Sequence, residues 1–207
     1  MELYRAEDSL RRLEKYCRIA EYKGWDPYDG LNSKVFKALP VLKNIDVARL
    51  AWIQLFKRNP VNLRKVLVVP KGHNSKGVAL MLSGYCNLLK YQRKTGKTEY
   101  GGENDIQDRI KFLAELLISL RSPAKDNHAS WGYNFDWQAR RLFLFPEGTP
   151  TVVVTSFCSS ALFDAYEIIK KEEYLSVALS SADFILNDLH RTPKEKGFLF
   201  SYSPLKG

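Results

Sequence analysis

Apolar residues recur at helical spacing over most of this 207-residue chain, and the helices that they predict are of two kinds. Segments 3–23, 103–121 and 173–190 each carry a single apolar stripe, whereas 75–94 and 150–170 are apolar around most of their circumference. A helix that is apolar all round belongs inside a core, and a striped helix belongs at its edge. The alternation therefore predicts stacked helical hairpins, each buried against its neighbours.

The pattern predicts an all-α fold in which residues 1–207 form a single domain, an incomplete α/α toroid of helical hairpins with short extended aromatic loops. An irregular helical bundle is the alternative. Short helices are also predicted at 33–40 and 44–58, while 62–69 is compatible with a helix or a strand. Because no inner helix follows the last aromatic loop, we expect a further C-terminal segment or an oligomer to complete the toroid.

A loop rich in glycine and aromatic residues follows each striped helix, at 24–30, 131–137 and 197–203. In the second loop every other residue is aromatic: Trp131, Tyr133, Phe135 and Trp137. An extended segment with this spacing presents aromatic rings on one face and polar side chains on the other.

The helix after this loop is predicted to open at Thr149 and Pro150. A threonine oxygen caps the free N–H groups of a helix, and proline fits the first helical turn.

The net charge of +9 fits either a soluble basic surface or an anionic partner. Cys17, Cys86 and Cys158 are odd in number and widely spaced, so they indicate buried thiols of a reducing compartment and give neither a disulfide framework nor a metal pair. The polar N-terminus lacks a secretion signal, and no apolar run approaches the ~20 residues that span a bilayer. We expect a cytoplasmic protein with no membrane partner.

Several classes of chemistry have no motif in the sequence. His73, His128 and His190 are isolated, so no metal site is predicted. The glycines match neither a phosphate-binding loop nor a dinucleotide fingerprint, and no serine lies in a nucleophile elbow. We therefore expect no cofactor, and no nucleic-acid partner, because only the net charge would favour one.

Five segments carry a resemblance to a known family: Tyr28–Ser33, Pro70–Gly77, Leu82–Tyr85, Trp131–Gln138 and Thr149–Phe157. They resemble a poorly characterised family of bacterial and archaeal proteins associated with polysaccharide-biosynthesis loci, whose members are longer than this chain. The resemblance implies an α/α toroid, the architecture of six-hairpin glycosidases, uronate lyases, glucuronyl epimerases and terpenoid cyclases. Related sequences sometimes carry a δ-aminolevulinic acid dehydratase label, but that enzyme is similar to a β/α barrel with a Schiff-base lysine, a setting that this helical pattern does not offer.

In a toroid of this kind the loops gather at one rim, where carboxylates beside aromatic rings suit sugars. We expect Asp136 to act as acid or base, with Asp26 or Asp29 as its partner. The candidate ligand-binding residues are aromatic, amide and basic side chains of the same loops: Tyr28, Lys71, His73, Trp131, Tyr133, Asn134, Trp137, Gln138, Arg140 and Tyr202. The alternative is that the aromatics pack the loops onto the core and the carboxylates cap turns.

The basic residues among these candidates, with the positive end of helix 150–170, suit a uronate or a phosphate. We therefore expect a carbohydrate-active or carbohydrate-binding protein of polysaccharide biosynthesis that acts on an acidic saccharide or polysaccharide by lyase, epimerase or hydrolase chemistry. The alternative is a non-catalytic helical-repeat scaffold that binds a protein or polymer. A deep pocket favours the first function and a shallow groove favours the second.

Overall fold

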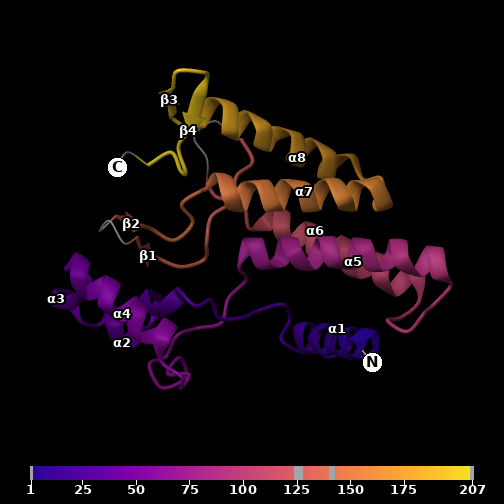
Figure 1. Cartoon of the computed structure of the whole chain (residues 1–207), viewed down its shortest axis with the longest axis horizontal. Coiled ribbons are helices and arrows are strands. Elements are labelled where there is room, and N and C mark those ends of the chain that lie inside the picture. Colours follow the sequence, from indigo (N-terminus) through magenta and orange to yellow (C-terminus); the bar gives the residue numbers. More distant parts are fainter. Residues whose placement is uncertain (1, 124–127, 140–142, 206–207) are drawn as a thin grey trace.

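A computed structural model describes residues 2–123, 128–139 and 143–205 (Figure 1). Within these residues the chain is mostly helical, which confirms the predicted class, and it adds two small antiparallel sheets. The α-helices are α1 (Glu2–Ile19), α2 (Lys34–Lys37), α3 (Pro40–Lys43), α4 (Asp46–Arg58), α5 (Ser75–Thr95), α6 (Glu103–Ser119), α7 (Val152–Ile169) and α8 (Glu172–Asp183). The paired strands are β1 (Trp137–Gln138) with β2 (Leu144–Phe145), and β3 (Arg191–Pro193) with β4 (Phe198–Phe200).

Helices α5 to α8 form the main bundle, in which α5 packs against α6 and α7, and α7 also packs against α8 (Figure 1). Three contacts between α5 and α7 follow the same order along both helices: Lys76 with Phe157, Ser83 with Asp164, and Lys90 with Glu167. The two helices that are most apolar in sequence are therefore parallel neighbours. Their amino-terminal ends lie at the same end of the bundle, next to the aromatic loops.

The core of the bundle consists of the predicted apolar faces of these four helices. Leu82 and Leu89 of α5, Ile110 of α6, Leu162 of α7 and Tyr174 of α8 are all completely or almost completely buried. Fully burying one such side chain stabilises a fold by about 1.5–3 kcal/mol. The helical periodicity of the sequence thus identified the core helices, although Leu80, Leu179 and Leu186 of the predicted apolar faces are exposed.

The start of α7 differs from the prediction. The helix begins at Val152 and its N-cap is Thr151, whose side chain accepts a hydrogen bond from Val154 N at 3.2 Å. Pro150 instead forms an antiparallel bridge with Gly132, which keeps the preceding residues extended. Pairing with the aromatic loop therefore delays the helix by two residues relative to the expected cap at Thr149.

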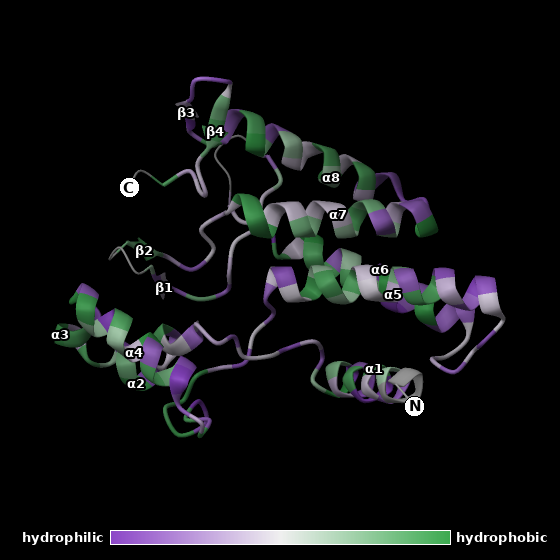
Figure 2. Ribbon diagram, viewed as in Figure 1, coloured by the Kyte–Doolittle hydropathy of each residue, from purple (hydrophilic) through white to green (hydrophobic). Residues whose placement is uncertain are grey.

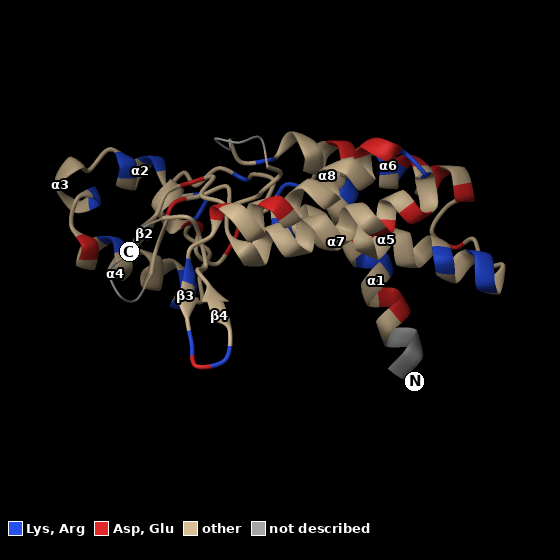
Figure 3. Cartoon of the chain, turned by 90° about the horizontal axis from the view of Figure 1, so that it is seen from above, with Lys and Arg blue, Asp and Glu red and all other residues tan. Residues whose placement is uncertain are grey.

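The apolar stripe predicted for α1 is largely unburied. Leu10 and Leu13 are exposed, and Cys17 is the buried member of the stripe among the side chains that the structure describes. Polar contacts hold α1 instead: Glu14 Oε1 accepts hydrogen bonds from Arg109 at 3.1 Å and from Tyr85 at 3.0 Å. The helix projects from the bundle, and acidic and basic residues are interspersed along α6 (Figure 3).

Residues 25–71 form a lobe beside the bundle, with a small core of its own around Leu31, Phe36 and Ile53. The segment 62–69, which the sequence left open between helix and strand, forms turns. Val69 is buried there, while Val66 is exposed and Val68 has a φ of +53°. This lobe forms one side of the candidate site.

Helix α7 is long and apolar enough to cross a membrane by length and composition, contrary to our expectation that no such run exists. Its first turns are strongly hydrophobic (Figure 2). The helix packs against α5, α6 and α8 in the bundle, and core helices of this kind pass the same test.

Replacement of Gly132 by alanine should destabilise the fold. A Cβ at this position would lie 2.2 Å from the backbone oxygen of Thr149, so the bridge that precedes α7 would have to shift. We expect Gly132→Ala to lower the free energy of unfolding by about 1–3 kcal/mol in urea denaturation. Gly84→Ala is the matched control, because no atom lies within 4 Å of its added Cβ in the middle of α5. The control should gain roughly 0.5–1 kcal/mol, and equal stabilities for the two variants would contradict the role of Gly132.

Candidate active site

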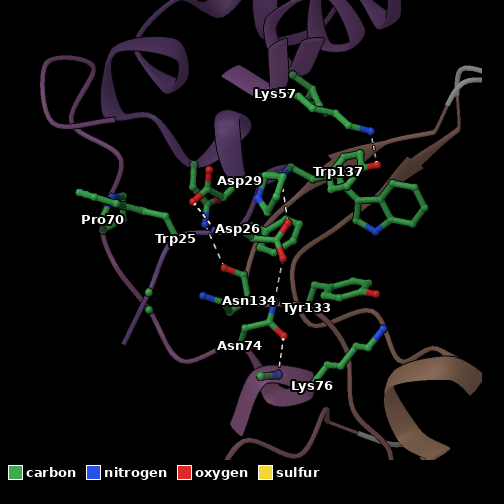
Figure 4. Close-up of a pocket in the computed structure, with 18 of the residues that line it drawn as sticks. Trp25, Asp26, Asp29, Lys57, Pro70, Asn74, Lys76, Tyr133, Asn134 and Trp137 are labelled. Atoms are coloured by element: carbon green, nitrogen blue, oxygen red, sulfur yellow. Dashed lines mark hydrogen bonds between the residues drawn. The ribbon is translucent and has the colours of Figure 1, made fainter. Parts of the chain in front are cut away.

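A cavity of about 700 Å³ lies between the lobe, the amino-terminal end of α5 and the aromatic loop 131–139 (Figure 4). This volume falls within the roughly 300–1,000 Å³ of typical ligand sites. The three aromatic loops meet here through Trp25, Tyr133 and Tyr202. Loops that are far apart in the sequence therefore share one cavity, as expected.

Loop 24–30 is held at the cavity by backbone pairing and by one arginine. Gly24 and Gly72 form an antiparallel bridge with N–H···O distances of 3.0 and 3.1 Å. Arg64 donates from Nε to Asp29 Oδ1 at 2.8 Å and from Nη2 to the Asp26 backbone oxygen at 2.8 Å. These bonds fix where the two carboxylates of the loop lie.

Asp26 is the carboxylate that faces the cavity (Figure 4). Its Oδ1 accepts from Tyr28 N at 2.9 Å and its Oδ2 accepts from Asn74 Nδ2 at 3.1 Å. Burial raises the pKa of Asp26, and the hydrogen bond from Tyr28 and the charges of Arg64 and Lys76 oppose the rise. A carboxyl group with a raised pKa is a stronger base once ionised, which suits proton transfer.

Asp29 also lines the cavity, but its oxygens are occupied by the loop itself. Oδ1 accepts from Arg64, and Oδ2 accepts from Asp26 N at 3.0 Å. Burial raises the pKa of Asp29, although the hydrogen bond and the charge of Arg64 act against it. This side chain holds the turn together, which matches the alternative that the carboxylates cap turns.

Trp131 anchors the aromatic loop and does not reach the cavity. Its indole is completely buried, and Nε1 donates to the Leu117 backbone oxygen of α6 at 2.7 Å. Its backbone oxygen accepts from Thr151 N at 3.0 Å, and its backbone N–H donates to Thr155 Oγ1 at 3.1 Å. The expectation that Trp131 contacts a ligand is not supported by this placement.

Tyr133, Phe135 and Trp137 all line the cavity, and so do Asn134 and Gln138 from the other face of the alternating pattern. The segment is a true strand only at Trp137 and Gln138, so its rings and amides do not separate into two faces. The Trp137 ring stacks on Phe145 at 4.4 Å between centroids. Burial, together with the neighbouring Tyr202 hydroxyl, raises the pKa of Tyr133, which keeps its phenol protonated.

Three side-chain amides at the cavity have polar atoms without a hydrogen-bond partner among the residues that the structure describes. They are Asn32 Oδ1, Asn134 Oδ1 and Gln138 Nε2. Gln138 is almost fully buried, and Arg49 Nε occupies its other amide atom at 2.7 Å. Each of these atoms is itself almost inaccessible to solvent, so the unpaired amides are a cost of packing behind the cavity wall and not open bonding positions for a ligand.

The side-chain amide of Asn134 packs directly against Gly72, which is possible because Gly72 lacks a side chain. A Cβ on Gly72 would lie 2.4 Å from Asn134 Nδ2. Asn32 Nδ2 donates to the Asn134 backbone oxygen at 2.9 Å, which joins the aromatic loop to the lobe. The glycine bridge and the Asn134 amide are therefore packed as one unit.

Four other predicted residues are placed differently from the expectation or are not described. Asp136 does not line the cavity, and its Oδ1 accepts from Glu147 N at 2.6 Å. Lys71 lies over the Trp25 ring, and His73 Nε2 bonds the Glu21 backbone oxygen at 2.9 Å, so neither lines the cavity wall. Arg140 lies outside the described residues.

Sequence reasoning missed Lys57, Asn32 and Asn74 as cavity residues. Lys57 extends from α4 and donates to the Tyr28 hydroxyl at 2.5 Å (Figure 4). It comes from a helix predicted only as a packing element, so no local signal marked it. Asn74 caps α5 through Gly77 N, and that capping pattern was the one available sign of its position.

Over the described ranges, no group of three or more His, Cys, Asp or Glu side chains is arranged to hold a metal ion. Comparison of the chain with protein-family models, curated proteins and solved structures finds no match.

The raised pKa of Asp26 predicts a specific pH dependence of stability. The folded protein binds this proton more readily than the unfolded chain, so the contribution of Asp26 falls as pH rises from the ordinary aspartate value, about 3.9, through the folded-state pKa. Asp26→Asn removes this contribution. The free energy of unfolding of the variant minus that of the wild type should therefore increase with pH across this window in urea denaturation. Loss of the Asp26 charge also removes one cause of the raised pKa of Asp29, which changes the difference in the same direction. A difference in unfolding free energy that does not change with pH would contradict the raised pKa of Asp26 in the folded protein.

Proposed function

We propose that the cavity binds an acidic saccharide and that the protein is a carbohydrate-active member of polysaccharide biosynthesis. The single observation that carries the proposal is the composition of the cavity wall: aromatic rings, side-chain amides, and two lysines near the carboxylates of loop 24–30. Apolar ring faces suit the C–H faces of a sugar, and amides suit its hydroxyls. Lys57 and Lys76 supply positive charge for an acidic group.

The helical arrangement supports an arc of an α/α toroid, which we propose as the architecture. In such a ring, parallel inner helices present their ends to a common rim, and α5 and α7 are parallel, with the amino-terminal turns of α5 lining the cavity. The family resemblance noted in the sequence favours the same architecture. Under this proposal, further hairpins from a longer form of the chain or from another copy close the ring.

We assign the proton-transfer role to Asp26. Asp136 lies off the cavity wall and Asp29 is held by Arg64, so two opposed carboxylates of the kind used in glycoside hydrolysis are not available among the predicted residues. A lyase or epimerase reaction needs one base to remove a proton beside the sugar carboxylate. Asp26 suits that base, and the protonated Tyr133 suits a hydrogen-bond donor or acid.

The volume of this partly open cavity favours this function over a non-catalytic scaffold. A repeat scaffold binds its partner on a broad, shallow groove, whereas this cavity has walls from the lobe, α5 and two loops. The exposed apolar residues of α1 are the feature that a scaffold would use, and they lie away from the cavity.

A glycan array tests the proposed function. The wild-type protein should bind uronate-containing oligosaccharides and bind their neutral counterparts more weakly, because a neutral sugar lacks the negative charge that Lys57 and Lys76 attract. Salt should weaken the preference, since the attraction is partly screened. Binding to no glycan, or equal binding to acidic and neutral glycans, would refute the proposed ligand class.

A pair of aromatic variants locates the site within the protein. Tyr202 is 37% exposed and lines the cavity, whereas Phe198 is 47% exposed on β4 and does not. We expect Tyr202→Ala to weaken binding of array-positive uronates about tenfold, as for a ring that contributes more than 1 kcal/mol. Phe198→Ala should bind as the wild type does, measured by isothermal titration calorimetry. Equal losses in both variants would place binding elsewhere.

A further inference from the structure

A small apolar surface on α7 adjoins the cavity mouth without belonging to the cavity wall. It consists of Val153 and Phe157, which are exposed one turn apart on α7, and we call it the α7 shelf. Phe157 is 40% exposed. The beginning of α7 is among the hydrophobic parts of the bundle surface (Figure 2). An exposed apolar surface beside a polar site is a candidate extension of that site.

The shelf is continuous with the cavity through α5. Lys76 lines the cavity, and its Nζ lies 4.5 Å from the centroid of the Phe157 ring. Leu80, one turn further along α5, also lines the cavity and is itself exposed. The Lys76 side chain extends beside Tyr133, toward the first turns of α7 (Figure 4). A ligand that leaves the cavity on this side therefore passes over Phe157.

The chemistry of the shelf repeats that of the cavity. A flat apolar ring lies next to one ammonium group, as the Tyr28 ring of the cavity lies 4.4 Å from Lys57 Nζ. A sugar unit can lay its C–H face on such a ring while its carboxylate meets the cation. A protein partner would need a much larger apolar area than these two side chains provide.

We propose that the α7 shelf is a second sugar subsite, and that the ligand is an acidic oligosaccharide or polysaccharide chain whose further units extend from the cavity over Phe157. This inference rests on the proposed function and adds the size of the ligand to it. Lys76 lies between the two subsites and serves both.

The test compares uronate ligands of increasing length on matched phenylalanine variants. Glucuronate and galacturonate oligosaccharides of one, two and four units are titrated calorimetrically into the wild type, Phe157→Ala and Phe163→Ala. Phe163 is the control because it is 38% exposed on the same helix but lies two turns beyond Phe157. Thermal denaturation verifies that all three proteins fold.

Wild-type affinity should rise with ligand length. Phe157→Ala should bind the four-unit ligand with about tenfold lower affinity than the wild type and bind the single unit with unchanged affinity. Phe163→Ala should match the wild-type affinity at every length. Phe157→Leu keeps apolar bulk without a flat ring, so its affinity for the four-unit ligand should lie between those of the wild type and Phe157→Ala.

Two results would overturn the subsite while leaving the proposed function intact: wild-type affinity that does not depend on length, or a length dependence that Phe157→Ala retains. A change in the self-association of Phe157→Ala by analytical ultracentrifugation, with unchanged sugar affinity, would instead identify the shelf as a contact between copies. Absence of binding at every length would defeat the proposed function itself, and this inference with it.

Discussion

The burial of the Trp131 indole is the interaction on which the rest of the site depends. The ring is enclosed by the bundle, and its N–H bonds the backbone of α6. The backbone of the same residue bonds Thr151 and Thr155 at the start of α7. One residue therefore ties the aromatic loop to two helices, through its side chain to α6 and through its backbone to the start of α7. A buried indole rarely lacks a partner for its N–H, and here that partner is a carbonyl near the end of a helix.

The cavity has a charge pattern that follows from its construction. Arg64 bonds the carboxylate of Asp29 and the backbone oxygen of Asp26, and both residues line the cavity. Lys57 and Lys76 approach from α4 and α5. The carboxyl group of Asp26, whose pKa is raised, thus shares the cavity wall with two lysines, with tyrosines and with side-chain amides. Such a site is suited to an anionic polyol more than to a purely apolar molecule.

The sequence predicted the helices well because hydrophobic periodicity is a local signal that burial reinforces. All the long helices are present near their predicted limits, and the apolar faces of α5 and α6 form the core. The errors arise where a contact distant in sequence overrides local preference. Pro150 pairs with Gly132, so the cap moves from Thr149 to Thr151. The stripe of α1 stays exposed because polar bonds, and not apolar packing, attach that helix.

The candidate site was predictable only in outline, for the same reason. Glycine and aromatic residues marked the loops that meet at the cavity, and Tyr133, Asn134 and Gln138 do line it. Which aromatic ring is buried and which is exposed depends on contacts between segments that are distant in the sequence. Trp131, which was predicted to contact a ligand, is therefore found buried in the core. The position of Asp136 was also not predictable from the sequence, because its carboxylate accepts a hydrogen bond from the backbone N–H of Glu147, which lies beyond β1. Lys57 has no sequence signal, since only the folding of the lobe brings α4 to the cavity.

The bridge between Gly24 and Gly72 has a consequence for how such a protein can diversify. Residues 25–71 leave the bundle after Gly24 and return to it at Gly72, and these two residues pair in an antiparallel bridge. The segment therefore resembles an insertion whose two ends lie side by side. Its interior is built from its own side chains together with Trp137 and Leu144 of the neighbouring loop. Replacing or reshaping the insert would therefore alter one wall of the cavity while the helices opposite kept their packing, which separates the evolution of selectivity from the maintenance of the scaffold.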